Sequence, residues 1–340
     1  LFHERPRLAL TLGDCAGIGP ELVLRALTSS ELSAASQLCV YGNRKLLDRV
    51  SSMVGIPVPK DVVTLSPDGL SEAPRDRHII LDFTFEAADA IAPGVLQSAC
   101  GKMAHTWICA AVRDIQAGHA DALVTAPINK EALHLAGVHF PGHTELIAHL
   151  TGVSNPCMAF YSPKLIVSLA TIHEALSEVP RLLSAPSLLH IIRLTQAACR
   201  KFGIASPRMG VLAFNPHAGE HGLFGDEESR IIVPAIDQAN AEGINAVGPL
   251  VPDTAFTWLN TNPAHPPFDA YVAMYHDQGL IPFKMVAFDT GVNVTLGLPI
   301  IRTSPDHGTA FDLAWQGKAS PNSLFSAITL AARMARPTAL

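Results

Sequence analysis

Charged residues, aromatic residues and long apolar runs are all scarce in this chain. Of its 340 residues 16% are charged and 6% are aromatic, and 24 Lys and Arg against 30 Asp and Glu give a net charge of -6. The lack of a basic block argues against nucleic acid as a main partner. No apolar run approaches the ~20 residues of a membrane span, and residues 1–7 lack the apolar core of a signal peptide. We expect a cytoplasmic protein that binds neither membrane nor nucleic acid.

Cysteine is sparse and follows no pattern. The six cysteines include no Cys-x-x-Cys pair; they are Cys15, Cys39, Cys100, Cys109, Cys157 and Cys199. In a chain of this length we expect reduced thiols rather than a disulfide framework. What the chain does have is apolar bulk, since 48% of its residues are hydrophobic. That is enough for a sizeable core, and its Ala, Leu, Val and Ile content is more typical of α/β layers than of a β-sandwich.

Short apolar segments alternate with amphipathic ones along the whole chain. We expect strands at 7–12, 37–41, 78–83, 120–125, 165–172, 209–214, 269–274 and 292–296, and helices at 22–27, 102–117, 187–202, 227–241 and 323–334. This alternation predicts a mostly parallel sheet with helices on both faces. The proline-rich stretches 57–74 and 260–267 are expected to be surface connections. With no clean linker, we expect a first α/β subdomain at 1–135 plus 300–340 and a second at 136–299.

Three histidines follow expected strands directly. His173 comes after a strand near 165–172, His217 after a strand near 209–214, and His276 after a strand near 269–274. Side chains at the carboxyl ends of parallel strands share one crevice. Three imidazoles there predict a divalent metal with a position left open for substrate. The alternative is three unrelated histidines, because imidazole is also a common hydrogen-bonded group at strand ends.

Two glycine-containing loops precede expected helices. Residues 13–21 follow the first strand, but their spacing departs from Gly-x-Gly-x-x-Gly, and Pro20 lacks a backbone donor, so we do not expect a Rossmann dinucleotide loop. Residues 141–145 place His143 and Thr144 at a helix start, where backbone amides favour a phosphate or carboxylate. Alternatively, Thr144 serves only as a helix cap.

The region 276–302 contains few charged groups among glycines and β-formers. Lys284, Asn293 and Arg302 lie in it, and they are candidates to hold an anionic substrate, with Arg302 suited to a bidentate contact. The alternative is that they lie on the surface between strands. Residues 306–314 predict a loop before a helix that suits a nucleotide.

Taken together, these motifs identify a family. The matching blocks lie within residues 13–319 and are 13–21, 124–130, 142–145, 215–220, 248–254, 275–284 and 306–310. The chain resembles the 4-hydroxythreonine-4-phosphate dehydrogenases of pyridoxine (vitamin B6) biosynthesis. It also resembles their relatives that act on 4-phospho-D-erythronate or on the cis-dihydrodiol of terephthalate.

The resemblance implies an activity and a fold. The activity is oxidation of a phosphorylated 3-hydroxy acid by NAD or NADP, followed by β-decarboxylation. The fold is that of the isocitrate and isopropylmalate dehydrogenases, with two α/β/α subdomains and no Rossmann domain. A divalent metal (zinc, cobalt, magnesium or manganese) is implied, bound by two histidines of one subunit and one of its partner, which makes the homodimer obligatory.

The resemblance also implies roles for individual residues. The metal ligands are His173, His217 and His276. The substrate contacts are His143, Thr144, Lys284, Asn293 and Arg302. The loop for the adenosine part of the cofactor contains His307, Gly308, Thr309, Ala310 and Asp312. Our catalytic candidates are Lys284 as general base, with Asp277 and Asp253 orienting the imidazoles.

The sequence leaves the substrate open. Cys15 stands where the family usually has proline, and residues 220–225 are closer to the phosphoerythronate branch than to the vitamin B6 enzymes. Phosphohydroxythreonine, phosphoerythronate and the dihydrodiol therefore all stay candidates, as do NAD and NADP. A metal hydrolase using the same histidines and a non-catalytic binding protein for phosphorylated metabolites are the alternatives from other classes.

Overall fold

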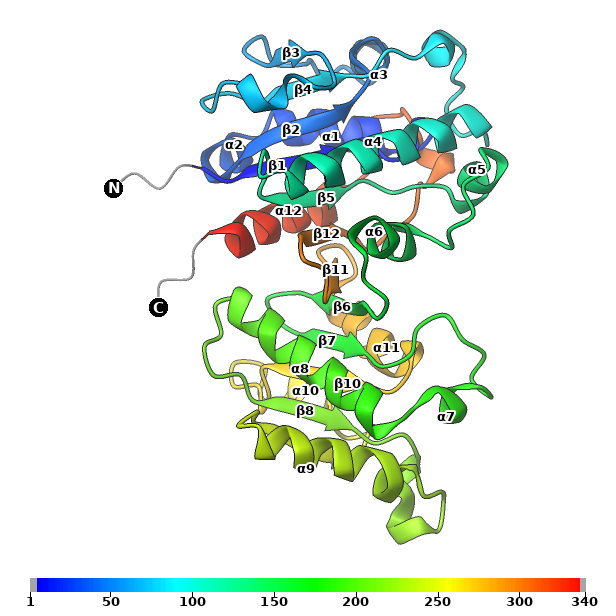
Figure 1. The fold of residues 1–340 in the computed structure, drawn as a ribbon, viewed down its shortest axis with the longest axis vertical. Coiled ribbons are helices and arrows are strands. Elements are labelled where there is room, and N and C mark those ends of the chain that lie inside the picture. The colour runs from blue at the N-terminus through cyan, green and yellow to red at the C-terminus, as the bar shows by residue number, and fades with distance from the viewer. Residues whose placement is uncertain (1–4, 337–340) are drawn as a thin grey trace. The chain divides into compact units, whose positions relative to one another are not determined.

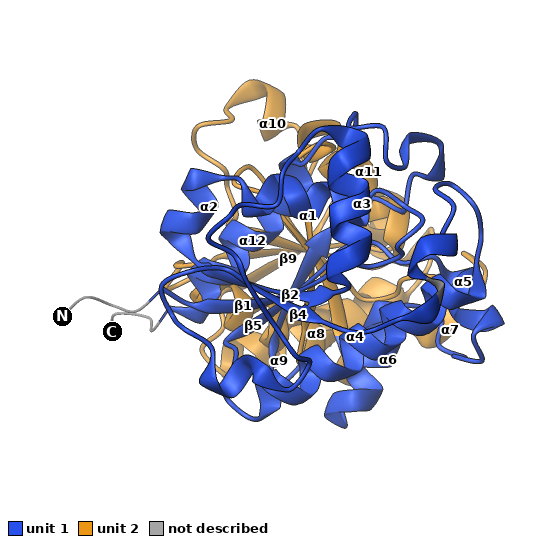
Figure 2. Ribbon diagram, turned by 90° about the horizontal axis from the view of Figure 1, so that it is seen from above, with its two compact units in different colours: residues 1–156, 298–337 blue, residues 157–297, 338–340 orange. Residues whose placement is uncertain are grey.

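The computed structural model describes residues 5–336, which form two compact units (Figures 1 and 2). The first unit contains residues 5–156 and 298–336, and the second contains residues 157–297. The chain thus starts one unit, builds the other and returns. The sequence analysis placed the first crossing at residue 135. In the structure it lies at residue 156, because helix α6 (His143–Thr151) packs on α4 (Ser98–Gln116) of the first unit.

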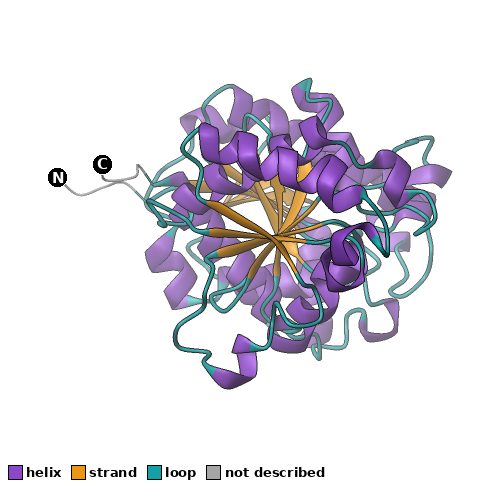
Figure 3. Cartoon of the chain, turned by 90° about the horizontal axis from the view of Figure 1, so that it is seen from below, coloured by secondary structure: helices purple, strands orange, loops and turns teal. Residues whose placement is uncertain are grey.

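The first unit has a parallel sheet. Its strands are β1 (Arg7–Thr11), β2 (Gln37–Gly42), β3 (Val63–Leu65), β4 (Ile79–Asp82), β5 (Ala122–Thr125) and β12 (Ile301–Pro305). They run in the order β3-β4-β2-β1-β5-β12. Every residue of β1 and β5 is buried. Continuous burial is what a parallel strand covered on both faces requires. Figure 3 shows the strands of the chain with helices around them.

The helices of the first unit form two layers. α4 packs on β1, β2 and β5 and also contacts α5 (Lys130–Leu135) and α6, whereas α12 (Asn322–Ala335) packs on β5 and β12 with α1 (Gly19–Leu27) and α2 (Ser30–Ala35) beside it. α3 (Arg44–Val54) packs on α1 and β4. Short 3₁₀ turns are η1 (Gly69–Glu72), η2 (Glu86–Ala90) and η5 (Phe311–Leu313).

The second unit has a mixed sheet in the order β11-β6-β7-β10-β8-β9. Its strands are β6 (Cys157–Tyr161), β7 (Ile166–Leu169), β8 (Met209–Leu212), β9 (Ala246–Leu250), β10 (Ala270–Ala273) and β11 (Val292–Leu296). β6 is antiparallel to both neighbours, and β7, β10, β8 and β9 are mutually parallel. The expectation of a mostly parallel sheet is confirmed.

Helices also cover the sheet of the second unit. α8 (Ala185–Lys201) packs on β6, β7, β10 and β11, and α9 (Val233–Ala241) packs on β9, whereas α11 (His276–Ala287) packs on β7 and β10. α11 contributes Phe283 to a hydrophobic core that also includes Phe160 and Tyr271. Shorter turns are α7 (Val179–Leu182), α10 (Trp258–Thr261), the irregular η3 (Pro216–Gly222) and the π-turn η4 (Glu228–Ile232).

Several sequence expectations about elements are wrong. Residues 57–74 are not only a connection, because they contain β3 and η1, and α10 enters the stretch 260–267. Residues 276–287 form α11 although Gly279 and Pro282 have low helix propensity. Burial of Leu280 and Phe283 in the core outweighs that low propensity.

All six cysteines are free, as expected. Within residues 5–336, every helix is too short or too polar to cross a membrane.

Candidate active site

The three candidate metal ligands follow the carboxyl ends of three neighbouring strands in the second unit's sheet. β10 is parallel to β7 on one side and to β8 on the other, so their carboxyl ends lie together. Buried Gln278 joins two of these ends: its Nε2 donates to Ala213 O at 2.7 Å and its Oε1 accepts from Met274 N at 2.7 Å. The Thr171 hydroxyl donates to Met274 O at 2.8 Å. Short side-chain bridges thus fix the strand ends from which the histidines follow.

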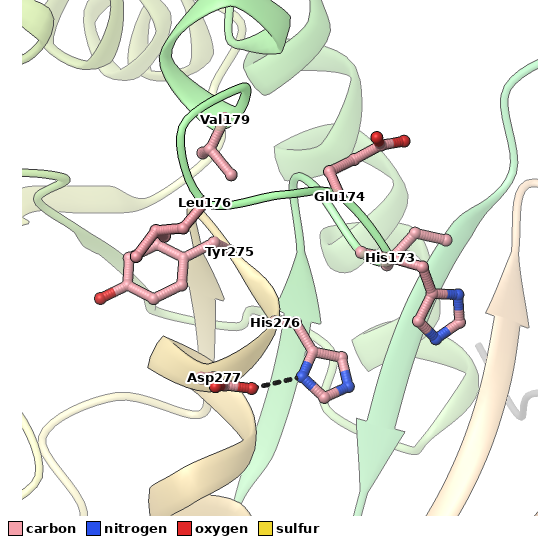
Figure 4. A pocket seen from close by; sticks show the side chains of 8 residues that line it. His173, Glu174, Leu176, Val179, Tyr275, His276 and Asp277 are labelled. Carbon is pink, nitrogen blue, oxygen red and sulfur yellow. Dashed lines mark hydrogen bonds and ion pairs between the residues drawn. The ribbon is translucent and has the colours of Figure 1, made fainter.

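His173 and His276 line a pocket of about 270 Å³ in the second unit (Figure 4). Their ring centroids are 5.9 Å apart. The Nδ1 of His276 is 2.7 Å from the Asp277 carboxylate, which leaves its Nε2 on the side of the ring away from the carboxylate. A carboxylate on one imidazole nitrogen is the usual support for a metal ligand on the other. The other lining residues are Ile172, Glu174, Leu176, Val179 and Tyr275.

His217 does not line this pocket. It is exposed and lies in a left-handed segment in which residues 217–221 all have positive φ. Such backbone costs L-residues roughly 1–2 kcal/mol each. Within residues 5–336, no three His, Cys, Asp or Glu side chains are close enough to hold a metal ion. One chain therefore brings together two of the three expected ligands and places the third, His217, outside their pocket.

A second group of side chains, the candidate anion-binding group, lies in the first unit. His143 begins α6 and buried Thr144 follows it. Buried Arg302 on β12 donates from Nη2 to the Thr125 hydroxyl at 2.9 Å. Burial lowers the pKa of Arg302 to about 10, an effect that Glu145 opposes. These groups suit the phosphate or carboxylate that the sequence analysis predicted here.

His143 is held as the neutral imidazole. Burial lowers its pKa well below the usual 6.5, and the charges of Arg302 and Lys130 lower it further. Its Nε2 is buried, and no other group among residues 5–336 hydrogen-bonds to it. A bound anion here would offset the two cationic charges and accept a hydrogen bond from that nitrogen.

Lys130 is a residue that the sequence analysis did not select. It starts α5, and a methyl group at Gly142 would lie 3.6 Å from its Cε, which places the lysine beside the start of α6. The available signal was the block Thr-Ala-Pro-Ile-Asn-Lys at 125–130, which was matched as a motif without assigning a role to its lysine.

The other candidate residues of the second unit are distributed over several elements. Lys284 is half-buried on α11, with Nζ 5.7 Å from the centroid of the Phe288 ring. Asn293 lies on β11 opposite Phe160 of β6. Asp253 is exposed after β9 and does not line the pocket of His173 and His276. Of the two candidate orienting carboxylates, Asp277 is the one that hydrogen-bonds an imidazole of that pocket.

The expected cofactor loop packs against the first loop of the chain. Ile18 N donates to Thr309 O at 3.0 Å, and a methyl group on Gly17 would lie 2.9 Å from the Cβ of Thr309. Ala310 has a φ of 41°, which is left-handed backbone. His307 and Asp312 are exposed, as is Gly308 between them.

The segment after this loop is fixed by side chains. The indole of Trp315 is buried and donates to Cys15 O at 3.0 Å. The buried Glu21 carboxylate accepts from Gly317 N at 3.1 Å and from Ala319 N at 2.9 Å. Hydrogen bonds with residues 13–21 therefore hold residues 309–319 in place.

Comparison with known proteins agrees with the resemblance found in the sequence. A protein-family model described as "Pyridoxal phosphate biosynthetic protein PdxA" matches residues 34–331. The 4-hydroxythreonine-4-phosphate dehydrogenase of Geobacter metallireducens is 45% identical, covering 98% of this chain and 97% of its own length. The D-threonate 4-phosphate dehydrogenase of Pectobacterium atrosepticum is 42% identical, covering 96% and 99%.

Solved structures agree with these relatives. The crystal structure of a 4-hydroxythreonine-4-phosphate dehydrogenase from Klebsiella pneumoniae has a TM-score of 0.86 at 40% identity, covering 99% of this chain and 100% of that one. A terephthalate 1,2-cis-dihydrodiol dehydrogenase from Burkholderia xenovorans has a TM-score of 0.68 at 27% identity, covering 97% and 98%.

Proposed function

The chain belongs to the family of the pyridoxal phosphate biosynthetic protein PdxA, and from this we propose that it oxidises the hydroxyl of a phosphorylated hydroxy acid with NAD or NADP. We further propose that β-decarboxylation follows. The relatives are named for 4-hydroxythreonine 4-phosphate and D-threonate 4-phosphate. A related acid such as 4-phospho-D-erythronate is a further candidate substrate.

The observation that carries the substrate class is the anion-binding group of the first unit. Arg302 and Lys130 supply positive charge, and His143 and Thr144 supply donors at the start of α6. Buried Arg302 and exposed Lys130, both beside a helix N-terminus, stabilise a dianionic phosphate more than they stabilise a neutral group. Binding the phosphate, which takes no part in the reaction, would position the substrate for chemistry.

The residues also fit a divalent metal when two copies of the chain are considered. His173 and His276, the latter oriented by Asp277, supply two imidazoles. We assign the third ligand to His217 of the partner subunit. A bound ion would supply Lewis acidity at the substrate hydroxyl and at the charge that develops as CO2 leaves, while the nicotinamide accepts the hydride. Lys284 is our candidate to accept the hydroxyl proton.

A homodimer follows from this assignment, and α11 offers a surface for it. Ile281, Met285 and Phe288 are 61%, 80% and 77% exposed and recur at helical spacing along one side of α11. A row of apolar side chains this exposed is typical of a protein interface. His276 begins the same helix, so a second copy bound here lies next to the metal ligands.

One further feature of the proposal concerns the architecture. We propose that the two units correspond to the two subdomains of an isocitrate dehydrogenase-like fold. The support is the course of the chain, which leaves the first unit after residue 156 and returns to it at residue 298.

A second candidate substrate is a carboxylated cis-dihydrodiol. The Burkholderia relative named for terephthalate 1,2-cis-dihydrodiol favours it, and the cationic group of the first unit also suits a carboxylate. The lower identity, 27% against 40–45%, ranks this candidate second.

The test is nicotinamide reduction by chelator-treated protein with each of the candidate substrates, with and without added divalent metal. We expect metal-dependent reduction with a phosphorylated hydroxy acid, together with release of CO2. Reduction with the dihydrodiol alone would move the chain to the second candidate. No reduction with any substrate would contradict the proposed function and leave a metal hydrolase or a binding protein.

A further inference from the structure

The backbone that carries His217 is the most irregular in the second unit. Residues 217–221 have φ values of 53°, 56°, 78°, 43° and 55°, and only Gly219 among them is a glycine. L-residues rarely adopt this left-handed region, and consecutive runs of them are rarer still. Such a segment persists only where its surroundings hold it, and strained segments concentrate at functional sites.

One buried carboxylate receives the hydrogen-bond donors at the entrance to this segment. Glu228 is 6% exposed. Its Oε1 accepts from Phe214 N at 2.8 Å and from Asn215 N at 2.7 Å. Its Oε2 accepts from Asn215 Nδ2 at 2.9 Å. Both oxygens therefore face N–H donors in the two residues that lead into Pro216 and His217.

The left-handed segment also packs directly against this carboxylate. A methyl group added at Gly219 would lie 2.7 Å from Glu228 Oε2, so a larger residue would have to displace the carboxylate. Gly219 has a φ of 78° in addition, which favours glycine independently. Glu228 is thus in contact with the entrance and the middle of the segment.

The helix that supplies Glu228 begins irregularly. Residues Glu228–Ile232 form a π-turn ahead of α9, and π-turns occur frequently at functional sites. Glu227, just before it, accepts a second hydrogen bond from Asn215 Nδ2 at 2.7 Å. Two adjacent carboxylates therefore hold one asparagine amide, while Glu228 alone also accepts the backbone N–H groups.

We propose that Glu228 is a positioning residue that holds the left-handed segment and thereby fixes the imidazole of His217 for metal binding. The role of Glu228 in metal binding rests on the proposed function, whereas its role in holding the backbone of residues 217–221 does not. Both of its oxygens are required as acceptors because an amide at this position would direct NH2 toward an N–H donor. Turning the Asn215 amide relieves that clash only by giving up the hydrogen bond to Glu227.

The experiment compares Glu228→Gln with wild type and with Glu242→Gln. Glu242 is a matched control because it forms an ion pair with Arg193, away from this segment. We expect amide hydrogen exchange at Phe214 and Asn215 to be at least about 10-fold faster in Glu228→Gln. We expect the affinity of the metal-free protein for Zn²⁺, measured by calorimetry, to fall roughly 10- to 100-fold. Glu242→Gln is expected to match wild type in both.

A second variant approaches the same packing from the other side. Gly219→Ala leaves the carboxylate intact but places a methyl group against it, and we expect the same two changes. Unchanged exchange, or unchanged zinc affinity, in a folded Glu228→Gln or Gly219→Ala protein would overturn the inference. Failure of wild type to reduce nicotinamide would contradict only the proposed function, because exchange and zinc affinity are measured without substrate or cofactor.

Discussion

At the scale of single residues, the least expected group is Asp14 in the first loop. It is 1% exposed and its Oδ1 accepts from Ala16 N at 2.8 Å. Burial raises its pKa from 3.8 to about 6, a change that the hydrogen bond from Ala16 opposes. The folded state therefore binds this proton more tightly than the unfolded chain does. The stability contributed by the neutral form is complete below about pH 4 and is lost as the pH rises through about 6.

The corresponding prediction concerns Asp14→Asn, which keeps the acceptor for Ala16 and removes the charge. Relative to wild type, its free energy of unfolding should rise by about 3 kcal/mol between about pH 4 and pH 8, because two pKa units are involved. Chemical denaturation across this range measures it. Asp61→Asn, at an exposed position of the same unit, is the control. A difference between Asp14→Asn and wild type that does not change with pH would contradict the argument.

A second residue-scale prediction concerns Lys130. Replacing it with Met removes one positive charge from the anion-binding group while keeping the length of the side chain. We expect kcat/KM for a phosphorylated substrate to fall about 10- to 100-fold, mainly through KM. Lys102→Met, an exposed change on α4 of the same unit, should leave steady-state kinetics unchanged. If Lys130→Met has wild-type KM, the phosphate does not bind beside α5.

These residues show what sequence reasoning reaches at this scale. His143 and Thr144 were selected because an apolar helix follows them, and Asp277 because it neighbours a candidate ligand. Lys130 escaped because a lysine at a helix start is ordinary by sequence, and only folding places it beside α6. Glu228 escaped because it lies eleven positions after His217 along the chain, and only folding brings it to the segment that contains His217.

At the scale of elements, the expected cofactor loop depends on its close fit to the first loop. Gly17 is the point of closest approach, since a methyl group there would lie 2.9 Å from both Cβ and O of Thr309. We predict that Gly17→Ala displaces the loop at 307–310 and raises KM for the nicotinamide cofactor, with little change in KM for the substrate. Steady-state kinetics with each reactant varied in turn measures this. Equal changes in both constants would argue against a cofactor role for this loop.

Element types were predictable where periodicity was regular. The expected strands near β1, β2, β5, β8, β10 and β11 and the helices near α4, α8, α9 and α12 all form. α11 was missed because Gly279 and Pro282 hide a helix that tertiary burial stabilises. β6, β9 and β12 were missed although they are no shorter than most of the expected strands as these form; β9 contains Gly248 and Pro249 and β12 ends in Pro305, and glycine and proline are depleted in strands.

At the scale of the whole molecule, the return of the chain to its first unit was predictable from the absence of a linker. The position of the crossing was not, because it depends on α6 packing against α4. The family resemblance implies that one chain supplies two of the three candidate histidines and its partner the third, and the structure places His173 and His276 in one pocket and His217 outside it. That result depends on the backbone of residues 217–221, whose left-handed form no composition signal reveals.

The proposed dimer leads to a prediction about α11. Met285→Glu introduces a charge into the middle of the exposed apolar row, and a charge buried in an interface without a partner is strongly unfavourable. We expect this variant to be monomeric by sedimentation and to have lost activity and zinc binding together. Met53→Glu, at a methionine that is 54% exposed on α3, is the control and should behave as wild type. A dimeric, active Met285→Glu protein would exclude this face as the interface.

The central claim is that two copies of the chain share each metal site, and heterodimer complementation tests it most directly. His173→Ala and His217→Ala chains with different affinity tags are co-expressed and the heterodimer is purified. If His217 binds the metal in the partner's site, one of the two sites of the His173→Ala/His217→Ala heterodimer keeps all three histidines. This heterodimer should then have roughly half the wild-type rate. Heterodimers of His173→Ala with His276→Ala have no intact site and should be inactive. Equal inactivity of both heterodimers would contradict the claim.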